Sequence, residues 1–95
     1  MNYQIISISD TDGWIFISAD DSFGNPDAFV SLVKAVTESV NGEISSVGWM
    51  RYKISNIPFD LVFQWDDLFG IVIINNNQTE KEDVLHFLKN YGVTF

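Results

Sequence analysis

The alternation of apolar and polar residues along the chain predicts several short β-strands, and two segments with apolar residues every three or four positions predict helices. Two β-rich runs stand at the start, Tyr3–Ser9 and Trp14–Ser18. The polar segment DTDG between them ends in glycine, as the loops of β-hairpins often do. We therefore expect the first two strands to pair as a hairpin.

The clearest helix is predicted for the segment NPDAFVSLVKAVTESVNG, residues 25 to 42. Asn25 is the expected N-cap, Pro26 the first helical residue, and Gly42 the glycine that follows the last turn. Apolar residues recur at spacings of three and four, so one face should pack against the core. These residues are Phe29, Leu32, Val33, Val36 and Val40.

The middle of the chain predicts three further strands. Ile44–Ser55 alternates between the two faces of a single strand, and Pro58 then interrupts the pairing. The β-branched run Gly70–Asn75 is typical of a central strand that is buried on both faces. Between these two strands, a third is expected to turn its alternate residues toward the core, namely Phe59, Leu61, Phe63 and Trp65.

A second helix is predicted near the end of the chain. Thr79 and Glu82 have the spacing of a capping box, and Gly92 stands where the helix should end. The predicted order is therefore ββαββα. It indicates a single α+β domain over residues 1–95, with a mainly antiparallel sheet of about five strands and both helices on one face. The apolar residues of the second helix are Val84, Phe87, Leu88 and Tyr91.

Thirteen acidic and five basic residues give the chain a formal net charge of −8. Such a surface repels phosphate backbones and anionic lipids, because affinity for nucleic acid comes largely from lysine and arginine. We therefore expect binding neither to nucleic acid nor to membranes. Arg51 and Lys53 share one strand face, and we expect them to pair with carboxylates of neighbouring strands, such as Asp60 or Asp66.

The absence of cysteine excludes disulfides, thiolate metal sites and a cysteine nucleophile. The first residues, MNYQIISISD, lack the basic and apolar segments of a signal peptide. No apolar run approaches the roughly 20 residues that span a bilayer. These features lead us to expect a cytoplasmic protein.

The sequence offers little for catalysis or metal binding. His86 is the only histidine, which excludes multi-histidine zinc sites, and no phosphate-binding loop, dinucleotide fingerprint or nucleophile elbow occurs. The aspartates of DTDG do not match a calcium loop, because Trp14 falls at the third ligand position after Asp10 and Asp12. We expect no enzymatic activity, no cofactor, and no catalytic or metal site.

The segment WDDLFG, residues 65 to 70, poses the main functional question. Asp66 and Asp67 are typical of turns, because aspartate side chains form hydrogen bonds with the nearby backbone. Leu68 and Phe69 are less typical, since two large apolar residues at a loop tip either fold back onto the core or project toward a partner. We predict a hairpin turn in the first place and a protein interface in the second.

These features together favour a protein-binding module that inhibits a cationic partner such as a nuclease. A carboxylate-rich surface can imitate the phosphates that a basic cleft binds, and complementary charge accelerates association. Trp14 and Phe23 are further candidate anchors beside the proposed partner-binding residues. These residues are Asp10, Asp12, Asp20, Asp21, Asp66, Asp67, Leu68 and Phe69.

In size, charge, lack of cysteine and element order, the whole chain resembles small acidic bacterial immunity proteins, including those of contact-dependent growth inhibition systems. The resemblance implies a stoichiometric inhibitor of a cognate basic toxin in the cytoplasm of the toxin-producing cell. No residue of that family can be carried over onto this sequence. The alternative is a small regulatory domain that binds a small molecule or a metal ion. Either a monomer or a homodimer is compatible with the sequence.

Overall fold

A computed structural model of the chain describes residues 3–9, 11–19, 26–77 and 80–94. The helices are α1 (Asp27–Val40) and α2 (Lys81–Lys89). The strands are β1 (Tyr3–Ile8), β2 (Trp14–Ala19), β3 (Ile44–Gly48), β4 (Arg51–Ile54), β5 (Leu61–Asp66), β6 (Gly70–Asn75) and β7 (Val93–Thr94).

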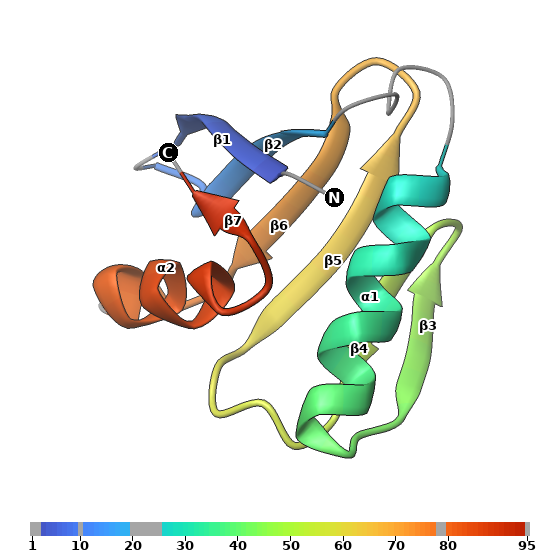
Figure 1. The fold of residues 1–95 in the computed structure, drawn as a ribbon. Helices are drawn as coiled ribbons and strands as arrows, with labels where there is room; N and C mark the ends of the chain where they lie inside the picture. The colour runs from blue at the N-terminus through green and yellow to red at the C-terminus, as the bar shows by residue number, and fades with distance from the viewer. Residues whose placement is uncertain (1–2, 10, 20–25, 78–79, 95) are drawn as a thin grey trace.

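Within these ranges the strands form a single sheet in the order β3-β4-β5-β6-β2-β1-β7 (Figure 1). All neighbouring strands are antiparallel except β1 and β7, which run parallel. The predicted α+β class with two helices and a mainly antiparallel sheet is therefore confirmed. The predicted strand count of about five and the order ββαββα are wrong, because the described chain has seven strands in the order ββαββββαβ.

The two additional strands have separate causes. The predicted single strand Ile44–Ser55 folds back on itself at Trp49 and Met50, so that β3 and β4 form a hairpin. Met50 lies in the left-handed region at φ 53°, which an unbranched side chain tolerates better than a β-branched one. At the other end of the chain, Val93 pairs with Tyr3 and extends the sheet by the short strand β7.

Both helices lie on the same side of the sheet (Figure 1), and their apolar faces join the inward side chains of the strands in one core cluster. Leu61, Phe63 and Trp65 are buried in this cluster, as their alternation predicted. The prediction for β6 is also confirmed. Ile71 and Ile73 face the helices, whereas Val72 and Ile74 are buried on the opposite face, in a small second cluster with Val62.

The ends of the helices agree with the sequence only in part. The residue in the left-handed conformation after α1 is Asn41, at φ 57°, and not the predicted Gly42. After α2, Gly92 does take a positive φ of 83°. The predicted caps Asn25 and Thr79 lie outside the described residues.

A buried hydrogen bond ties β1 to the start of α1. The Tyr3 hydroxyl donates to the Ala28 carbonyl oxygen at 2.8 Å, and Tyr3 is only 5% exposed. Burial raises the pKa of the Tyr3 hydroxyl above the ordinary value for tyrosine. The folded state therefore holds this proton more tightly than the unfolded state does.

We expect Tyr3→Phe to lower the free energy of unfolding by about 1–2 kcal/mol at neutral pH, because the Ala28 carbonyl loses its buried donor. In the parent protein, the raised pKa gives stability that is fully present below the unfolded pKa of about 10 and is lost as the pH rises through the folded value. The difference between parent and variant should therefore narrow in alkali. Urea denaturation at neutral and alkaline pH measures both effects.

Tyr91→Phe is the matched control for this prediction. The Tyr91 hydroxyl donates to Ser39 Oγ at 3.0 Å, but this bond is exposed to solvent. Its loss should change stability by less than about 0.5 kcal/mol. Equal losses in the two variants would contradict a specific role for the buried Tyr3 bond.

Candidate functional site

The two adjacent aspartates lie in the hairpin that joins β5 to β6. One carboxylate oxygen of Asp66 accepts hydrogen bonds from the backbone N–H groups of Leu68, at 2.7 Å, and Phe69, at 3.1 Å. Gly70 follows at φ 74°, in the left-handed region that favours glycine. Asp66 is therefore a turn residue, as predicted, and its carboxylate fixes the backbone of the two apolar residues that follow.

Of the two apolar residues at the tip, one projects into solvent and the other folds back onto the protein. Leu68 projects from the tip and is 77% exposed. Phe69 is 54% exposed and leans against Phe16 of β2, with 5.7 Å between the ring centroids. Phe16 in turn contacts Trp14, so the predicted anchor Trp14 belongs to the small cluster on the face opposite the helices.

Trp49 lies at the same end of the sheet, in the turn between β3 and β4. The backbone N–H of Trp65, at the end of β5, donates to the Met50 carbonyl at 3.1 Å, which holds that turn beside the β5–β6 hairpin. Trp49 is 74% exposed, and its ring meets the buried ring of Trp65 at 6.1 Å. Sequence reasoning missed Trp49, because it placed the residue inside a continuous strand.

The hairpin end, as we name this surface, comprises Trp49, Asp66, Asp67, Leu68 and Phe69. Its members come from two turns that are distant in sequence and adjacent in space. Leu68 projects from the tip near the exposed carboxylate of Asp67. Trp49 contacts Trp65 on the helix side of the sheet, whereas Phe69 contacts Phe16 on the opposite side. Exposed aromatic side chains surrounded by a polar rim are typical of protein-binding surfaces.

The structure does not bring all the predicted partner-binding residues together. Asp12 is exposed in the loop between β1 and β2, at the other end of the sheet from the hairpin end. Trp14, which follows the loop of Asp12, pairs with Ile74 near the end of β6, whereas Gly70 starts β6 at the hairpin end. The length of β6, about 17 Å, therefore separates the β1–β2 loop from the β5–β6 hairpin. Asp10, Asp20 and Asp21 lie outside the described residues, as does Phe23.

Of the two cations predicted to pair with carboxylates, Lys53 does so, whereas Arg51 forms no ion pair among the described residues, so the prediction for Arg51 is wrong. Lys53 forms an ion pair with Asp60 at 2.8 Å, which confirms the predicted pairing. The hydrogen bond from Lys53, with a second from Asn76, holds the pKa of Asp60 below its usual range. Both side chains of the pair are about half exposed, so solvent screens the attraction and its effect on stability is small.

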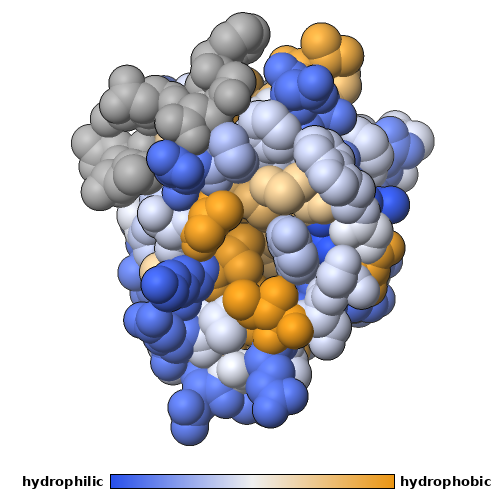
Figure 2. Space-filling view, turned by 90° about the vertical axis from the view of Figure 1, so that its right-hand side faces the viewer, coloured by the Kyte–Doolittle hydropathy of each residue, from blue (hydrophilic) through white to orange (hydrophobic). Residues whose placement is uncertain are grey.

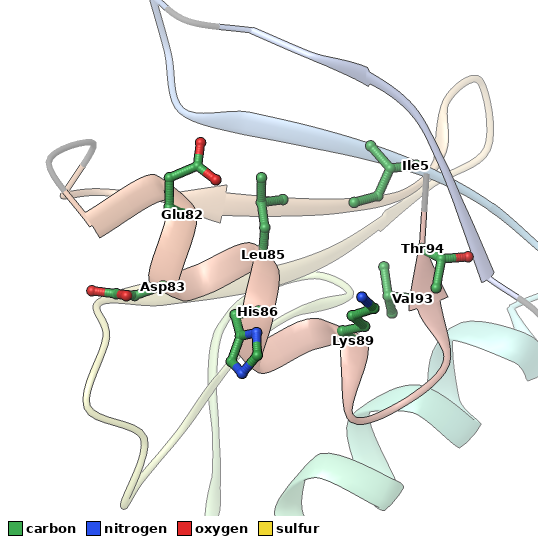
Figure 3. Close-up of a pocket in the computed structure, with 8 residues that line it drawn as sticks. All are labelled: Ile5, Glu82, Asp83, Leu85, His86, Lys89, Val93 and Thr94. Carbon is green, nitrogen blue, oxygen red and sulfur yellow. The ribbon is translucent and has the colours of Figure 1, made fainter.

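A separate hollow of about 580 Å³ lies between α2 and the strands β1 and β7 (Figure 3). Leu85 of α2 and Ile5 of β1 point toward each other across it, and His86 and Lys89 stand at its rim. The volume suits a small molecule. The charged side chains around it are exposed rather than buried, however, so they would hold a ligand only weakly.

Two further features of the described residues concern metal binding and membranes. Those residues contain no group of three or more histidine, aspartate or glutamate side chains placed to hold a metal ion. Nor does any helix among them combine the length and apolar character needed to cross a lipid bilayer. His86, the single histidine, is exposed on α2.

Comparison with protein-family models, with curated proteins and with solved structures finds no match to this chain.

Proposed function

We propose that this protein is a protein-binding module that inhibits a basic partner, in the manner of a bacterial immunity protein neutralising a toxin such as a nuclease. The observation that carries the proposal is the hairpin end. Leu68 projects from a turn that Asp66 fixes, and the turn that carries the exposed Trp49 is hydrogen-bonded to the end of β5 next to it. Because the backbone of Leu68 is already fixed, ordering this turn costs little conformational entropy on binding, which makes Leu68 an effective anchor.

The charge of the chain supports the same function. With a net charge of −8, the protein attracts a basic surface over the range of the Debye length, about 8 Å at physiological salt. Asp67 is exposed beside the anchors, so part of this charge lies at the proposed interface. The acidic residues would then raise the association rate, whereas Leu68, Phe69 and Trp49 would slow dissociation.

The regulatory domain remains the second candidate, because the hollow between α2, β1 and β7 has the volume of a small-ligand site. This function predicts a rise in melting temperature when a small molecule binds, by the usual linkage of binding to stability. The inhibitor predicts instead a stable complex with another protein. The two candidates also use different surfaces, so variants of the hairpin end distinguish them.

The first test is co-expression with the product of the adjacent upstream gene in a host that is sensitive to that product. Survival of the host and co-purification of the two proteins would support the inhibitor. The complex should weaken at high salt, because ions screen the acidic surface. No rescue and no co-purification, with the protein well folded, would contradict inhibition of that partner.

Within such a complex, we expect Leu68→Ala to raise the dissociation constant about tenfold or more, as the loss of an interface anchor does. The fold should keep its stability, because Leu68 is 77% exposed. Calorimetric titration and thermal melting measure the two quantities. Ile6→Ala is the matched control, since Ile6 is 62% exposed on β1, away from the hairpin end. If both variants bind as the parent does, Leu68 lies outside the interface.

A further inference from the structure

The strand β3 forms one edge of the sheet, and all five of its residues are exposed. Its sequence, ISSVG, contains no proline, lysine or other charged residue, although edge strands commonly carry such residues to prevent pairing with another chain. The outer backbone groups of β3 are therefore open to a further strand. β7 at the opposite edge has only two residues and offers a much shorter ladder.

The hydrogen bonds of β3 show which backbone groups face this free edge. The Ser55 N–H donates to the Glu43 carbonyl at 3.0 Å, so the backbone of Glu43 faces β4. Successive residues of an antiparallel strand direct their N–H and C=O groups to alternate sides. Ile44 and Ser46 therefore present their N–H and C=O groups outward.

A groove runs beside this edge, between β3 and α1. Figure 2 shows its apolar floor as the orange area in the middle of the molecule. The groove has a volume of about 340 Å³, and among the described residues that line it the only charged one is Lys34. Val30 and Ile44 are each about half exposed on its two walls. Phe29, Val33 and Tyr52 complete the lining.

An irregularity limits how far a regular ladder can extend along β3. The register with β4 shifts between Ser46 and Gly48, and the Ser46 hydroxyl donates to the Gly48 carbonyl at 3.1 Å. Such a bulge bends the strand beyond Ser46. A partner strand would thus pair with the segment around Ser45, where the register is regular.

We propose that β3 pairs with β3 of a second copy of this chain, antiparallel and with Ser45 on the two-fold axis. Ile44 of each copy then lies opposite Ser46 of the other. The N–H and C=O groups of both residues point outward, so Ile44 of one copy and Ser46 of the other can exchange two backbone hydrogen bonds. Side chains two apart share a face, so Ile44 and Ser46 lie on the groove side. Ile44 of the second copy covers the small Ser46 and extends the apolar groove.

Charge complementarity supports a second copy as the occupant. Where the regular ladder ends, Glu43 of one copy comes next to the bulged Val47 of the other, which precedes Gly48, the partner of Arg51 across β3 and β4. Arg51 is exposed, and no carboxylate among the described residues lies within ion-pair distance of it. Each dimer would therefore contain two symmetric Glu43–Arg51 contacts, and Lys34 also lies in the groove.

The net charge of −8 on each copy opposes self-association, so the charges close to the β3 edge decide whether two copies can meet there. The cations Lys34, Arg51 and Lys53 are all on α1 or β4, close to this edge. The acidic residues around them are Glu38 of α1, Glu43 before β3, Asp60, which already pairs with Lys53, and Asp66 at the end of β5, beside the start of β4. The edge is thus less acidic than the chain as a whole, so the repulsion between two copies is smaller here than over the rest of the surface.

The test is sedimentation equilibrium of the purified chain over a concentration series up to about 1 mM, the range in which weak association becomes measurable. We expect a reversible monomer–dimer equilibrium. Glu43→Arg should weaken the dimer about tenfold, because it places like charges together. Combining it with Arg51→Glu should restore the dissociation constant to within about threefold of the parent value, since both contacts re-form with reversed sign.

Ile44→Lys tests the apolar part of the interface. This substitution should abolish the dimer at concentrations where the parent chain dimerises, because a charged lysine on an edge strand prevents pairing with another strand. Ile6→Lys, on the exposed bulge of β1, is the matched control and should leave the dimer intact. Thermal melting verifies that each variant is folded. A parent chain that stays monomeric, or a charge reversal that fails to restore pairing, would overturn the proposal and leave the edge to a strand of another protein.

Discussion

Replacing Gly42 with alanine is expected to lower the free energy of unfolding by about 1–3 kcal/mol, the usual cost of adding atoms where there is no room for them. Gly42 follows the last turn of α1, where the chain passes close to the end of β4. A Cβ atom at this position would collide with the carbonyl oxygen of Ser55. The reason lies in tertiary contact, because the backbone of Gly42 does not take a positive φ.

The collision cannot be relieved easily, because hydrogen bonds fix the backbone on both sides. The Glu43 N–H donates to Ser55 Oγ at 2.8 Å, and the Ser55 N–H donates to the Glu43 carbonyl at 3.0 Å. Asn56 Nδ2 donates to the Asn41 carbonyl at 2.9 Å. Moving Ser55 away from residue 42 would strain or break these contacts.

Gly48→Ala is the matched control for this prediction. A Cβ atom at Gly48 would meet Arg51 Cδ at 3.1 Å, but this atom belongs to a long, exposed side chain that can move aside. We expect a change of less than about 1 kcal/mol, the usual range for surface substitutions. Urea denaturation of the two variants measures the difference. If both variants lose the same free energy of unfolding, the contact with the Ser55 carbonyl is not the reason why alanine is unfavourable at position 42.

Replacing Phe63 with alanine is expected to lower the free energy of unfolding by about 3–5 kcal/mol, as the removal of a buried phenylalanine does. Phe63 is fully buried and lies in β5, between Tyr52 of β4 and Ile73 of β6. The helices cover this side of the sheet, so the lost ring leaves a cavity that its neighbours fill only partly. In a domain of 95 residues, such a loss is a large share of the total stability.

Phe69→Ala removes the same side chain at an exposed position. Phe69 is 54% exposed, and its main aromatic contact is with Phe16. We expect a loss of no more than about 1.5 kcal/mol, the upper value for an aromatic pair. Chemical denaturation with both variants measures the contrast. A loss at Phe69 as large as that at Phe63 would mean that the hairpin end is part of the core, and it would remove Phe69 from the proposed interface.

The local features of the candidate site could be predicted from the sequence. The turn at Asp66 depends on hydrogen bonds to residues two and three positions further on, and Gly70 takes the conformation that glycine favours. The pairing of Lys53 with Asp60 was also predictable, since Asp60 was one of two carboxylates expected on a strand next to that of Lys53. Each of these features involves residues that are close in sequence.

Trp49 shows why the rest could not be predicted. Its segment, VGWMRY, has no asparagine, proline or glycine pair at the turn itself, and the alternation of Ile44–Ser55 suits one strand as well as two. The turn is held by a hydrogen bond from Trp65 to Met50, fifteen residues apart, and by the contact of two tryptophan rings. No local pattern contains that information.

The sequence by itself determined the class of fold, both helices, the buried faces of β5 and β6, and the turn that carries Leu68 and Phe69. These depend on periodic burial and on hydrogen bonds within a few residues. Only the tertiary structure decided that Trp49 joins Leu68 at one end of the sheet, that Asp12 lies at the other, and that β3 is a free edge. Strand order decides all three, because it brings together or separates residues that are far apart along the chain.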